Sequence, residues 1–226
     1  YPAGNMNSYT NYDGDGGVLI NSFLRQLLFS WKFDDYRILF TRSFKQGSRV
    51  MFYRNILRRC YKAAPFLSFD EDPYAFITDD GRLKFIIDAY TVSGNYPYSE
   101  PYTGSLSWLG GINYIRNSVK TVIDAYTGKI TFYIADEEDL LIRTYANIFP
   151  NLFVPFDRMP EDIKKHIRYP VNYLSVQADR LLTYHINDPD IFYQREDVWA
   201  FTSERYRDNY MPIEPYYVMV RFPDRE

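Results

Sequence analysis

The fold is decided by residues 113–136, which read NYIRNSVKTVIDAYTGKITFYIAD. Side chains of alternating character run from 119 to 124 and again from 130 to 134, a pattern typical of β-strands. The residues between these runs include Gly128, which can adopt the positive φ that a tight turn requires. The stretch therefore predicts a β-hairpin.

The word Ile-Asp-Ala-Tyr-Thr occurs twice, at 87–91 and at 123–127, so that Asp88 and Asp124 are 36 residues apart (124 − 88). The first copy follows a turn signal, Asp79-Asp80-Gly81, which strand-like residues flank on both sides. We therefore expect a second hairpin of related design in the same antiparallel sheet, with the two aspartates in equivalent positions.

Helical spacing predicts several helices around this sheet, so the expected fold class is α+β, in one domain over 1–226. A helix from residue 18 should face the core through Ile20, Phe23, Leu24, Leu27, Leu28 and Trp31. A second is expected over 48–64, with Val50, Tyr53, Leu57, Cys60 and Ala64 inward. Later helices should begin near Asp139, with Leu140, Leu141, Tyr145 and Ile148 as the apolar face, and near Pro160 and Pro170. A loop or a short helix should start at Asp188, and a last strand should span 215–222.

Composition excludes some classes of protein. The chain has 226 residues and a net charge of −3, which gives no attraction to nucleic acid phosphates. A single cysteine, Cys60, excludes an intramolecular disulfide. No apolar run approaches the roughly 20 residues of a membrane helix. The chain begins at Tyr1 and ends in the strand-like run, so we expect a segment of a longer protein.

The chain contains 23 tyrosines, several of them in the loop expected between the hairpins. Residues 95–102 read NYPYSEPY. Long loops in compact domains are usually functional or mobile, and tyrosine offers an apolar ring with a polar tip. This loop is the predicted contact surface for a protein partner.

Carboxylates near the two hairpins are the first candidate site. They could act as a general acid/base pair or as cation ligands, whereas the alternative is a local role in accepting amide hydrogen bonds from turns. The binding candidates, with the neighbouring tyrosines, are Asp70, Asp72, Tyr74, Asp88, Tyr90, Asp124 and Tyr126.

A second candidate is a calcium-type loop, in which Asn11, Asp13, Asp15 and Gly16 match the first ligand positions. Ser22 stands where the bidentate glutamate should be, so we predict no metal site there. An intermediate possibility is an anion held by the amides of 14–18 at a helix N-terminus.

Arg54, Arg58 and Lys62 form a basic stripe at helical spacing. It could face an anionic lipid surface, or form ion pairs with the acidic residues 70–72. The two histidines, His166 and His185, form no zinc pattern, and His185 is predicted to end a helix. The sequence has no Gly-x-Ser-x-Gly nucleophile motif and no nucleotide fingerprint, and no cofactor is predicted.

With these motifs in view, the chain resembles uncharacterised protein family 0182 from bacteria. The segments that carry the resemblance include 16–18, 23–29, 64–67, 70–74, 88–91, 96–99, 113–120, 166–170, 183–185 and 195–199. The resemblance implies a multi-pass membrane protein, with this segment in a large region outside the cytoplasm and transmembrane helices elsewhere. It brings no activity, catalytic residue or ligand.

Two hypotheses follow. In the first, the chain is an extracytoplasmic domain of a membrane protein and serves as a binding or assembly module. In the second, it is a cell-envelope hydrolase that uses paired carboxylates such as Asp72 and Asp88. An enzyme should gather carboxylates of raised pKa in one cleft, whereas a module should expose an aromatic surface.

Overall fold

A computed structural model describes residues 2–3, 6–7, 12–104, 106–213, 215–218 and 220. It divides into two compact units, unit 1 over Tyr1–Ala89 and Ser118–His166, and unit 2 over Tyr90–Asn117 and Ile167–Glu226. The chain passes from one unit to the other within strand β7 (Leu83–Ser93), within strand β8 (Tyr114–Asp124) and again after His166. The prediction of one domain over 1–226 stays a prediction.

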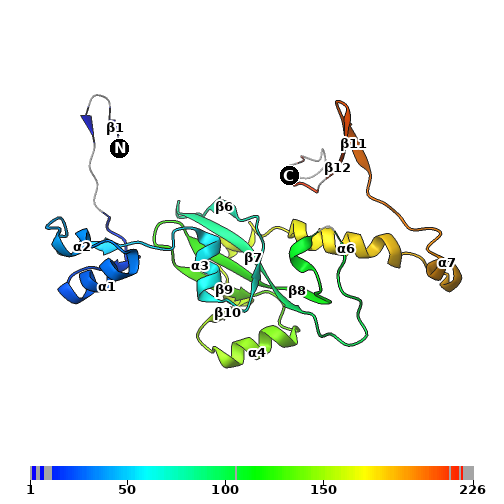
Figure 1. Ribbon diagram of the computed structural model, residues 1–226, viewed down its shortest axis with the longest axis horizontal. Helices are drawn as coiled ribbons and strands as arrows, with labels where there is room; N and C mark the ends of the chain where they lie inside the picture. Colours follow the sequence, from blue (N-terminus) through cyan, green and yellow to red (C-terminus); the bar gives the residue numbers. More distant parts are fainter. Residues whose placement is uncertain are drawn as a thin grey trace. The chain divides into compact units, whose positions relative to one another are not determined.

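The main sheet of the described chain has six strands in the order β10-β9-β8-β7-β5, with β6 also paired to β7 (Figure 1). The pairs β6/β7 and β8/β9 are antiparallel, and Thr121 lies opposite Phe132. Strand β10, in contrast, runs parallel to β9, so the sheet contains more than antiparallel hairpins. The remaining strands are β5 (Ser68–Phe69), β6 (Tyr74–Ile77), β9 (Ile130–Ile134) and β10 (Phe153–Pro155).

The two copies of Ile-Asp-Ala-Tyr-Thr adopt different conformations, so the expected equivalence of Asp88 and Asp124 is wrong. The first copy lies inside β7, which continues through Val92 and Ser93. The second ends β8 and enters a turn, because Gly128 follows it with a φ of +72° and donates its amide to the Asp124 carbonyl at 2.8 Å. The residues that follow the word therefore decide its structure.

The core of unit 1 lies between the sheet and two helices, α3 (Ile56–Ala63) and α4 (Leu140–Ile148). The N-terminus of α4 is where the acidic run predicted it, since the buried Asp139 caps the helix by accepting from the amides of Leu141 and Ile142. The inward face differs from the prediction, because Ile142 is buried and Leu140 and Ile148 are exposed. The buried residues of this core are Cys60, Ala64, Leu67, Phe69, Ile87, Ala89, Val119, Ile123, Phe132, Ile142 and Phe153.

The helix predicted over 48–64 is shorter, and begins at Ile56. Asn55 caps it by accepting from the amide of Arg58 at 2.9 Å, and Tyr53 has a φ of +53°, which a helix does not allow. Residues Arg49–Val50 form β4 instead, which pairs with β3 (Val18–Leu19). Cys60 and Ala64 are buried as predicted, and burial raises the pKa of the Cys60 thiol to about 12.

The helix predicted from residue 18 is α1 (Phe23–Phe33), with Ser22 as its N-cap. Ile20 is buried as predicted, but it precedes the helix. The expected inward side is wrong, since helix α1 buries Phe29 and Ser30 while its other apolar side chains are exposed. The short α2 (Arg37–Phe40) follows. The exposed side chains of α1 are Phe23, Leu24, Leu27, Leu28, Trp31 and Phe33.

Proline and aspartate start the later helices as predicted. Pro160, Pro170 and Asp188 are the N-caps of α5, α6 and α7, and His185 is the C-cap of α6. The strand predicted over 215–222 is absent at 215–218 and 220, and its other residues lie outside the described chain. The bounds are α5 Glu161–Lys164, α6 Val171–Tyr184, α7 Pro189–Gln194, the 3-10 helices η1 Ser107–Leu109 and η2 Phe156–Arg158, and strands β1 Pro2–Ala3, β2 Met6–Asn7, β11 Ser203–Tyr206 and β12 Asn209–Pro212.

Unit 2 has its own small core, formed by Tyr102, Leu109 and Val176. Among the described residues of both units, no helix has the length and apolar character that crossing a bilayer demands.

Candidate functional site

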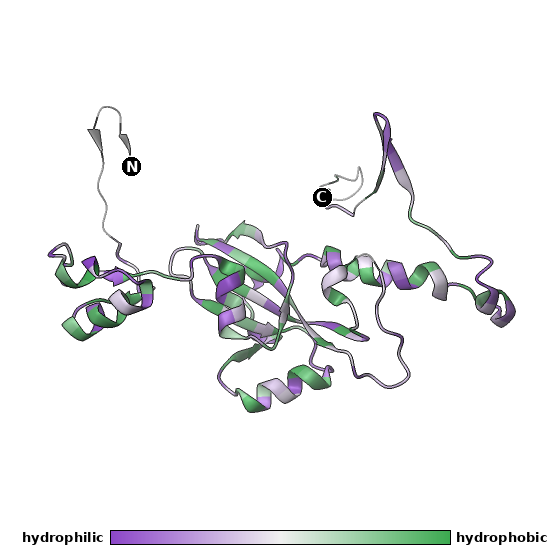
Figure 2. Ribbon diagram, viewed as in Figure 1, coloured by the Kyte–Doolittle hydropathy of each residue, from purple (hydrophilic) through white to green (hydrophobic). Residues whose placement is uncertain are grey.

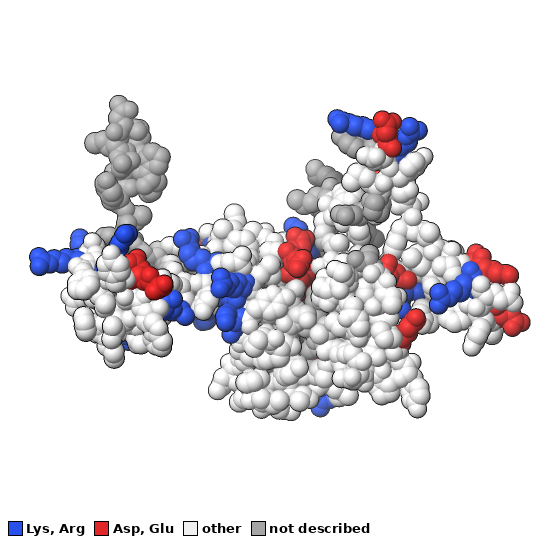
Figure 3. Space-filling model, in the orientation of Figure 1, with Lys and Arg blue, Asp and Glu red and all other residues white. Residues whose placement is uncertain are grey.

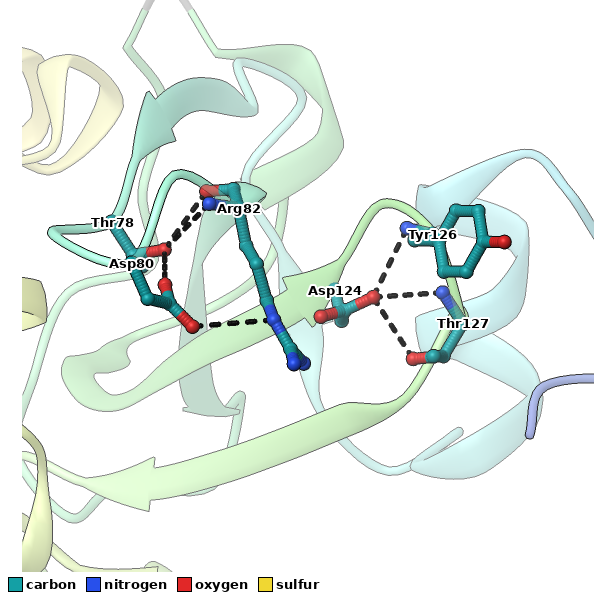
Figure 4. Close-up of polar contacts among 6 residues, drawn as sticks. All are labelled: Thr78, Asp80, Arg82, Asp124, Tyr126 and Thr127. Atoms are coloured by element: carbon teal, nitrogen blue, oxygen red, sulfur yellow. Dashed lines mark hydrogen bonds and ion pairs between the residues drawn. The ribbon is translucent and has the colours of Figure 1, made fainter. Parts of the chain in front are cut away.

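The turn after β8 is fixed by its own first residue. One carboxylate oxygen of Asp124 accepts from the amides of Tyr126 and Thr127, at 3.0 and 2.7 Å, and from the Thr127 hydroxyl at 2.9 Å (Figure 4). Burial opposes ionisation of Asp124, but these hydrogen bonds outweigh it and hold the pKa of the carboxyl below its ordinary value. Asp124 is therefore an ionised turn residue.

The turn between β6 and β7 uses the same chemistry with different residues. Thr78 donates its hydroxyl to Asp80 and accepts from the amide of Arg82 at 3.1 Å (Figure 4). The Arg82 side chain also lies 3.2 Å from the Asp80 carboxylate. The hydrogen bond from Thr78 lowers the pKa of Asp80. Asp124 therefore has the local role in a turn that the sequence left open, and Asp80 accepts a hydroxyl hydrogen bond in the other turn.

Segment 12–17 packs on the turn after β8. The rings of Tyr12 and Tyr126 lie 4.8 Å apart, and the Tyr126 hydroxyl donates to the Asp13 carboxylate. A Cβ atom on Gly16 would come within 2.3 Å of the Thr127 carbonyl oxygen, so only glycine permits this approach. The segment thereby forms one wall of a cavity.

Two adjoining cavities of about 400 and 540 Å³ share Gly17, Phe52, Tyr53, Arg59 and Gly128. We call this combined cavity the Arg59 pocket. The guanidinium of Arg59 lies directly against Gly128, where an added Cβ would stand 2.9 Å from its Cζ. Its other lining residues are Tyr12, Val18, Met51, Arg54, Asn55, Ile56, Lys62, Ala63, Phe85, Ile123, Asp124, Ala125, Tyr126, Thr127, Lys129 and Ile130.

Four cations line the Arg59 pocket, namely Arg54, Arg59, Lys62 and Lys129. In the part of the chain that the structure describes, none of them forms an ion pair. The proposed pairing of the basic stripe with the acidic residues 70–72 is therefore not found there. Figure 3 shows Lys and Arg side chains gathered over α3, which supplies two of the four.

Positive charges around the pocket lower the pKa of Tyr53. A hydrogen bond from Lys32 Nζ at 3.4 Å and the charge of that lysine lower the pKa of the Tyr53 phenol, and Lys62 and Arg58 act in the same direction. The guanidinium of Arg58 also lies 5.7 Å from the centre of its ring. Its left-handed backbone costs about 1 kcal/mol, and such strain is often found at functional sites.

This arrangement suits an anion that carries a flat or apolar group. Arg59 donates from Nη1 to the Phe52 carbonyl at 3.2 Å and keeps further guanidinium donors for a ligand, and the two lysines add point charges. The rings of Phe52 and Tyr53 offer apolar contact beside them. Asp124, the one acid among the described residues that line the pocket, has one of its two carboxylate oxygens occupied by the turn.

The other predicted carboxylates lie elsewhere in unit 1. Asp88 is buried in β7 and pairs with the ammonium of Lys120 on β8. Asp70, also buried, donates its amide to the Asp88 carbonyl at 2.8 Å, and its carboxylate accepts from the amide of the exposed Asp72 at 3.0 Å. Asp70, Asp72 and Asp88 are thus neighbours, whereas Asp124 belongs to the Arg59 pocket. The paired-carboxylate site stays a prediction.

The remaining predicted features fall at separate places. Tyr74 lies opposite Ile86 in the β6/β7 pair, and Tyr90 belongs to unit 2, where its ring is 6.0 Å from those of Trp108 and Tyr173. The loop 95–102 is held by the Asn113 side chain, which bonds both backbone groups of Tyr96 at 2.9 Å. Tyr96 and Tyr98 on this loop are exposed.

The calcium-type loop is only partly described, because Asn11 lies outside the described residues. Asp13 accepts from Tyr126, and the Asp15 carbonyl accepts from Arg49 at 2.8 Å. The possible anion site on the amides of 14–18 required a helix N-terminus at that point, whereas helix α1 begins only at Phe23. His166 stacks on Phe76, with ring centres 4.8 Å apart, and His185 on Trp199, at 3.7 Å.

Sequence reasoning found Arg54, Lys62, Asp124 and Tyr126 but not the pocket that joins them. Arg59 was not predicted as a site residue, because helical spacing linked Arg54, Arg58 and Lys62 into the basic stripe and left Arg59 outside it. The pocket combines segments near residues 12–18, 51–63 and 123–130, and spacing along one segment cannot predict that convergence.

Comparison with known proteins shows that the chain is similar to one family of proteins over its whole length. The model of the Uncharacterised protein family (UPF0182) matches residues 1–226. The chain is 49% identical over 223 residues to a UPF0182 protein of Desulforamulus reducens, covering 99% of this chain and 23% of that protein. It is 48% identical over 227 residues to UPF0182 protein sll1060 of Synechocystis sp., covering 98% of this chain and 22% of the relative.

A UPF0182 protein of Methanospirillum hungatei is 47% identical over 227 residues, covering 100% of this chain and 25% of that protein. The chain thus spans about a quarter of the length of the curated relatives it matches. No solved structure matches it. With a match over the whole chain, this protein belongs to the uncharacterised family UPF0182.

Proposed function

We propose that this chain is a binding module that holds an anionic ligand in the Arg59 pocket. The observation that carries the proposal is the set of four pocket cations with no ion pair in the described chain. Leaving such charges together costs energy through mutual repulsion, which a bound anion would relieve. The aromatic wall of Phe52 and Tyr53 favours ligands with an apolar part.

The test is the binding of inorganic pyrophosphate, measured by isothermal titration calorimetry. We expect Arg59→Gln with Lys62→Gln to weaken binding by tenfold or more, because a hydrogen bond to a charged group contributes roughly 1.5–3 kcal/mol. Raising the salt concentration should weaken binding in the original chain, since the Debye length falls to about 3 Å at 1 M.

The matched control is Arg143→Gln with Lys165→Gln, which removes the same two charges from exposed positions outside the pocket. It should leave the affinity unchanged, and thermal melts should show that all variants fold. Equal losses in the two double variants, or no binding by the original chain, would contradict the proposal.

We further propose that the module is the extracytoplasmic part of a longer membrane protein, whose transmembrane helices lie outside this segment. The resemblance described above and the greater length of the relatives support this. Reporter fusions within this segment of the intact protein test it. We expect active alkaline phosphatase and dark green fluorescent protein, and the reverse pattern would place the segment in the cytoplasm.

A further inference from the structure

Helix α1 carries a continuous apolar face that is open to solvent in the described structure. Its members are 45–83% exposed, although leucine, phenylalanine and tryptophan favour burial. Because successive helical residues are about 100° apart, they fall within an arc of about 140°. Figure 2 shows the hydrophobic colouring of α1. We call these five residues, Phe23, Leu24, Leu27, Leu28 and Trp31, the α1 face.

The opposite side of α1 is the one that packs inside unit 1. The ring of Phe29 lies 5.8 Å from that of Phe52, and the ring of Phe33 lies 6.2 Å from it. Phe29 and Phe33 therefore anchor the helix by one side, and the α1 face is a separate apolar surface on its other side. Anchoring of α1 does not need the α1 face.

The surroundings of the α1 face are cationic. Residues 23–49 contain six Lys or Arg and two Asp, a net charge of +4 in a chain whose total is −3. Helix α1 itself has Arg25 and Lys32 beside the face and no carboxylate. A surface of this kind complements an anionic partner.

The other side of helix α1 contacts residues that line the Arg59 pocket. Phe52 and Tyr53 line the pocket, and Lys32 of α1 places its Nζ atom 5.3 Å from the centre of each of these rings. The packing of Phe29 and Phe33 on Phe52 connects the same two parts. Unit 1 thus contains both an exposed apolar helix face and the four pocket cations.

We propose that the α1 face docks on the surface of an anionic lipid bilayer. Helices of this type bury an apolar face at the boundary between headgroups and acyl chains, where tryptophan is also favoured. Cations near the surface add attraction to anionic lipid. The docking of α1 rests on its own exposed face and on the charge around it, and not on ligand binding in the Arg59 pocket.

The experiment is flotation of the 226-residue chain with two kinds of vesicle, pure phosphatidylcholine and a mixture with phosphatidylglycerol. We expect binding to the mixed vesicles alone, with a blue shift of tryptophan fluorescence that Trp31→Phe removes. Leu27→Asn with Leu28→Asn should lower the partition coefficient by about tenfold for each leucine, because each loses its apolar burial.

The matched control is Leu140→Asn with Leu181→Asn, which changes two comparably exposed leucines on other helices. It should bind vesicles like the original chain. Circular dichroism should give the same fold for all variants, since each altered side chain is exposed.

Pyrophosphate binding separates this proposal from the preceding one. The variant Leu27→Asn with Leu28→Asn should no longer bind vesicles but should still bind pyrophosphate. If the original chain binds vesicles but not pyrophosphate, only the proposal of an anion in the Arg59 pocket is overturned. Equal binding to both vesicles, or to neither, overturns the docking proposal. A dimer that forms with rising protein concentration, and that Leu27→Asn with Leu28→Asn abolishes, would also overturn the docking proposal if the original chain does not bind vesicles. The α1 face would then pair with a second copy of the chain.

Discussion

Replacing Lys120 with methionine is expected to lower the free energy of unfolding by about 3–5 kcal/mol. The Lys120 and Asp88 side chains are only 8% and 4% exposed, and the ammonium contacts one carboxylate oxygen across strands β8 and β7. Without the lysine, the Asp88 carboxylate keeps its burial but loses the charge that compensates it. Denaturation in urea, followed by circular dichroism, measures the loss.

The double variant Asp88→Leu with Lys120→Met is the control for this prediction. Replacing both partners of a buried pair by apolar residues of similar volume is often neutral, so it should recover at least half of the loss. A double-mutant cycle then gives the coupling energy between the two side chains. Strictly additive losses, or a single-variant loss below about 1 kcal/mol, would show that the pair contributes little.

The Asp88–Lys120 pair also shows how far the sequence could predict this structure. Alternation correctly predicted β8 and β9 around Gly128, because that signal lies within one short stretch. The repeated word suggested the same role for Asp88 and Asp124. One aspartate lies in the middle of a strand and the other caps a turn, since the following residues differ. A local word cannot encode its long-range partner.

Helix ends were predicted better than helix faces. Asp139, Pro160, Pro170 and Asp188 mark N-termini through chemistry that acts within one turn. The inward side of α1 was predicted wrongly, because periodicity shows that a face is apolar and not what covers it. The Arg59 pocket was missed for a related reason, since its cations come from separate segments.

Truncation of Phe132 to alanine is expected to cost about 3–5 kcal/mol, whereas the same change at Phe23 should cost less than about 0.5 kcal/mol. Phe132 is 2% exposed in β9, and its ring centre lies 6.1 Å from Phe153 on the parallel strand and 6.4 Å from Phe69. Its removal leaves a cavity between the sheet and the residues packed on it. Phe23, at the start of α1, is 69% exposed.

The two variants form a matched pair, because they delete the same ring from a buried strand and from an exposed helix. Urea midpoints measured at constant slope would report the two losses directly. A large loss for Phe23→Ala would mean that the α1 face is covered in the folded chain, as the periodicity first suggested, and would remove the face on which lipid docking rests. A small loss there, beside a large one at Phe132, places the stabilising apolar contacts in the sheet and leaves the α1 face free to bind.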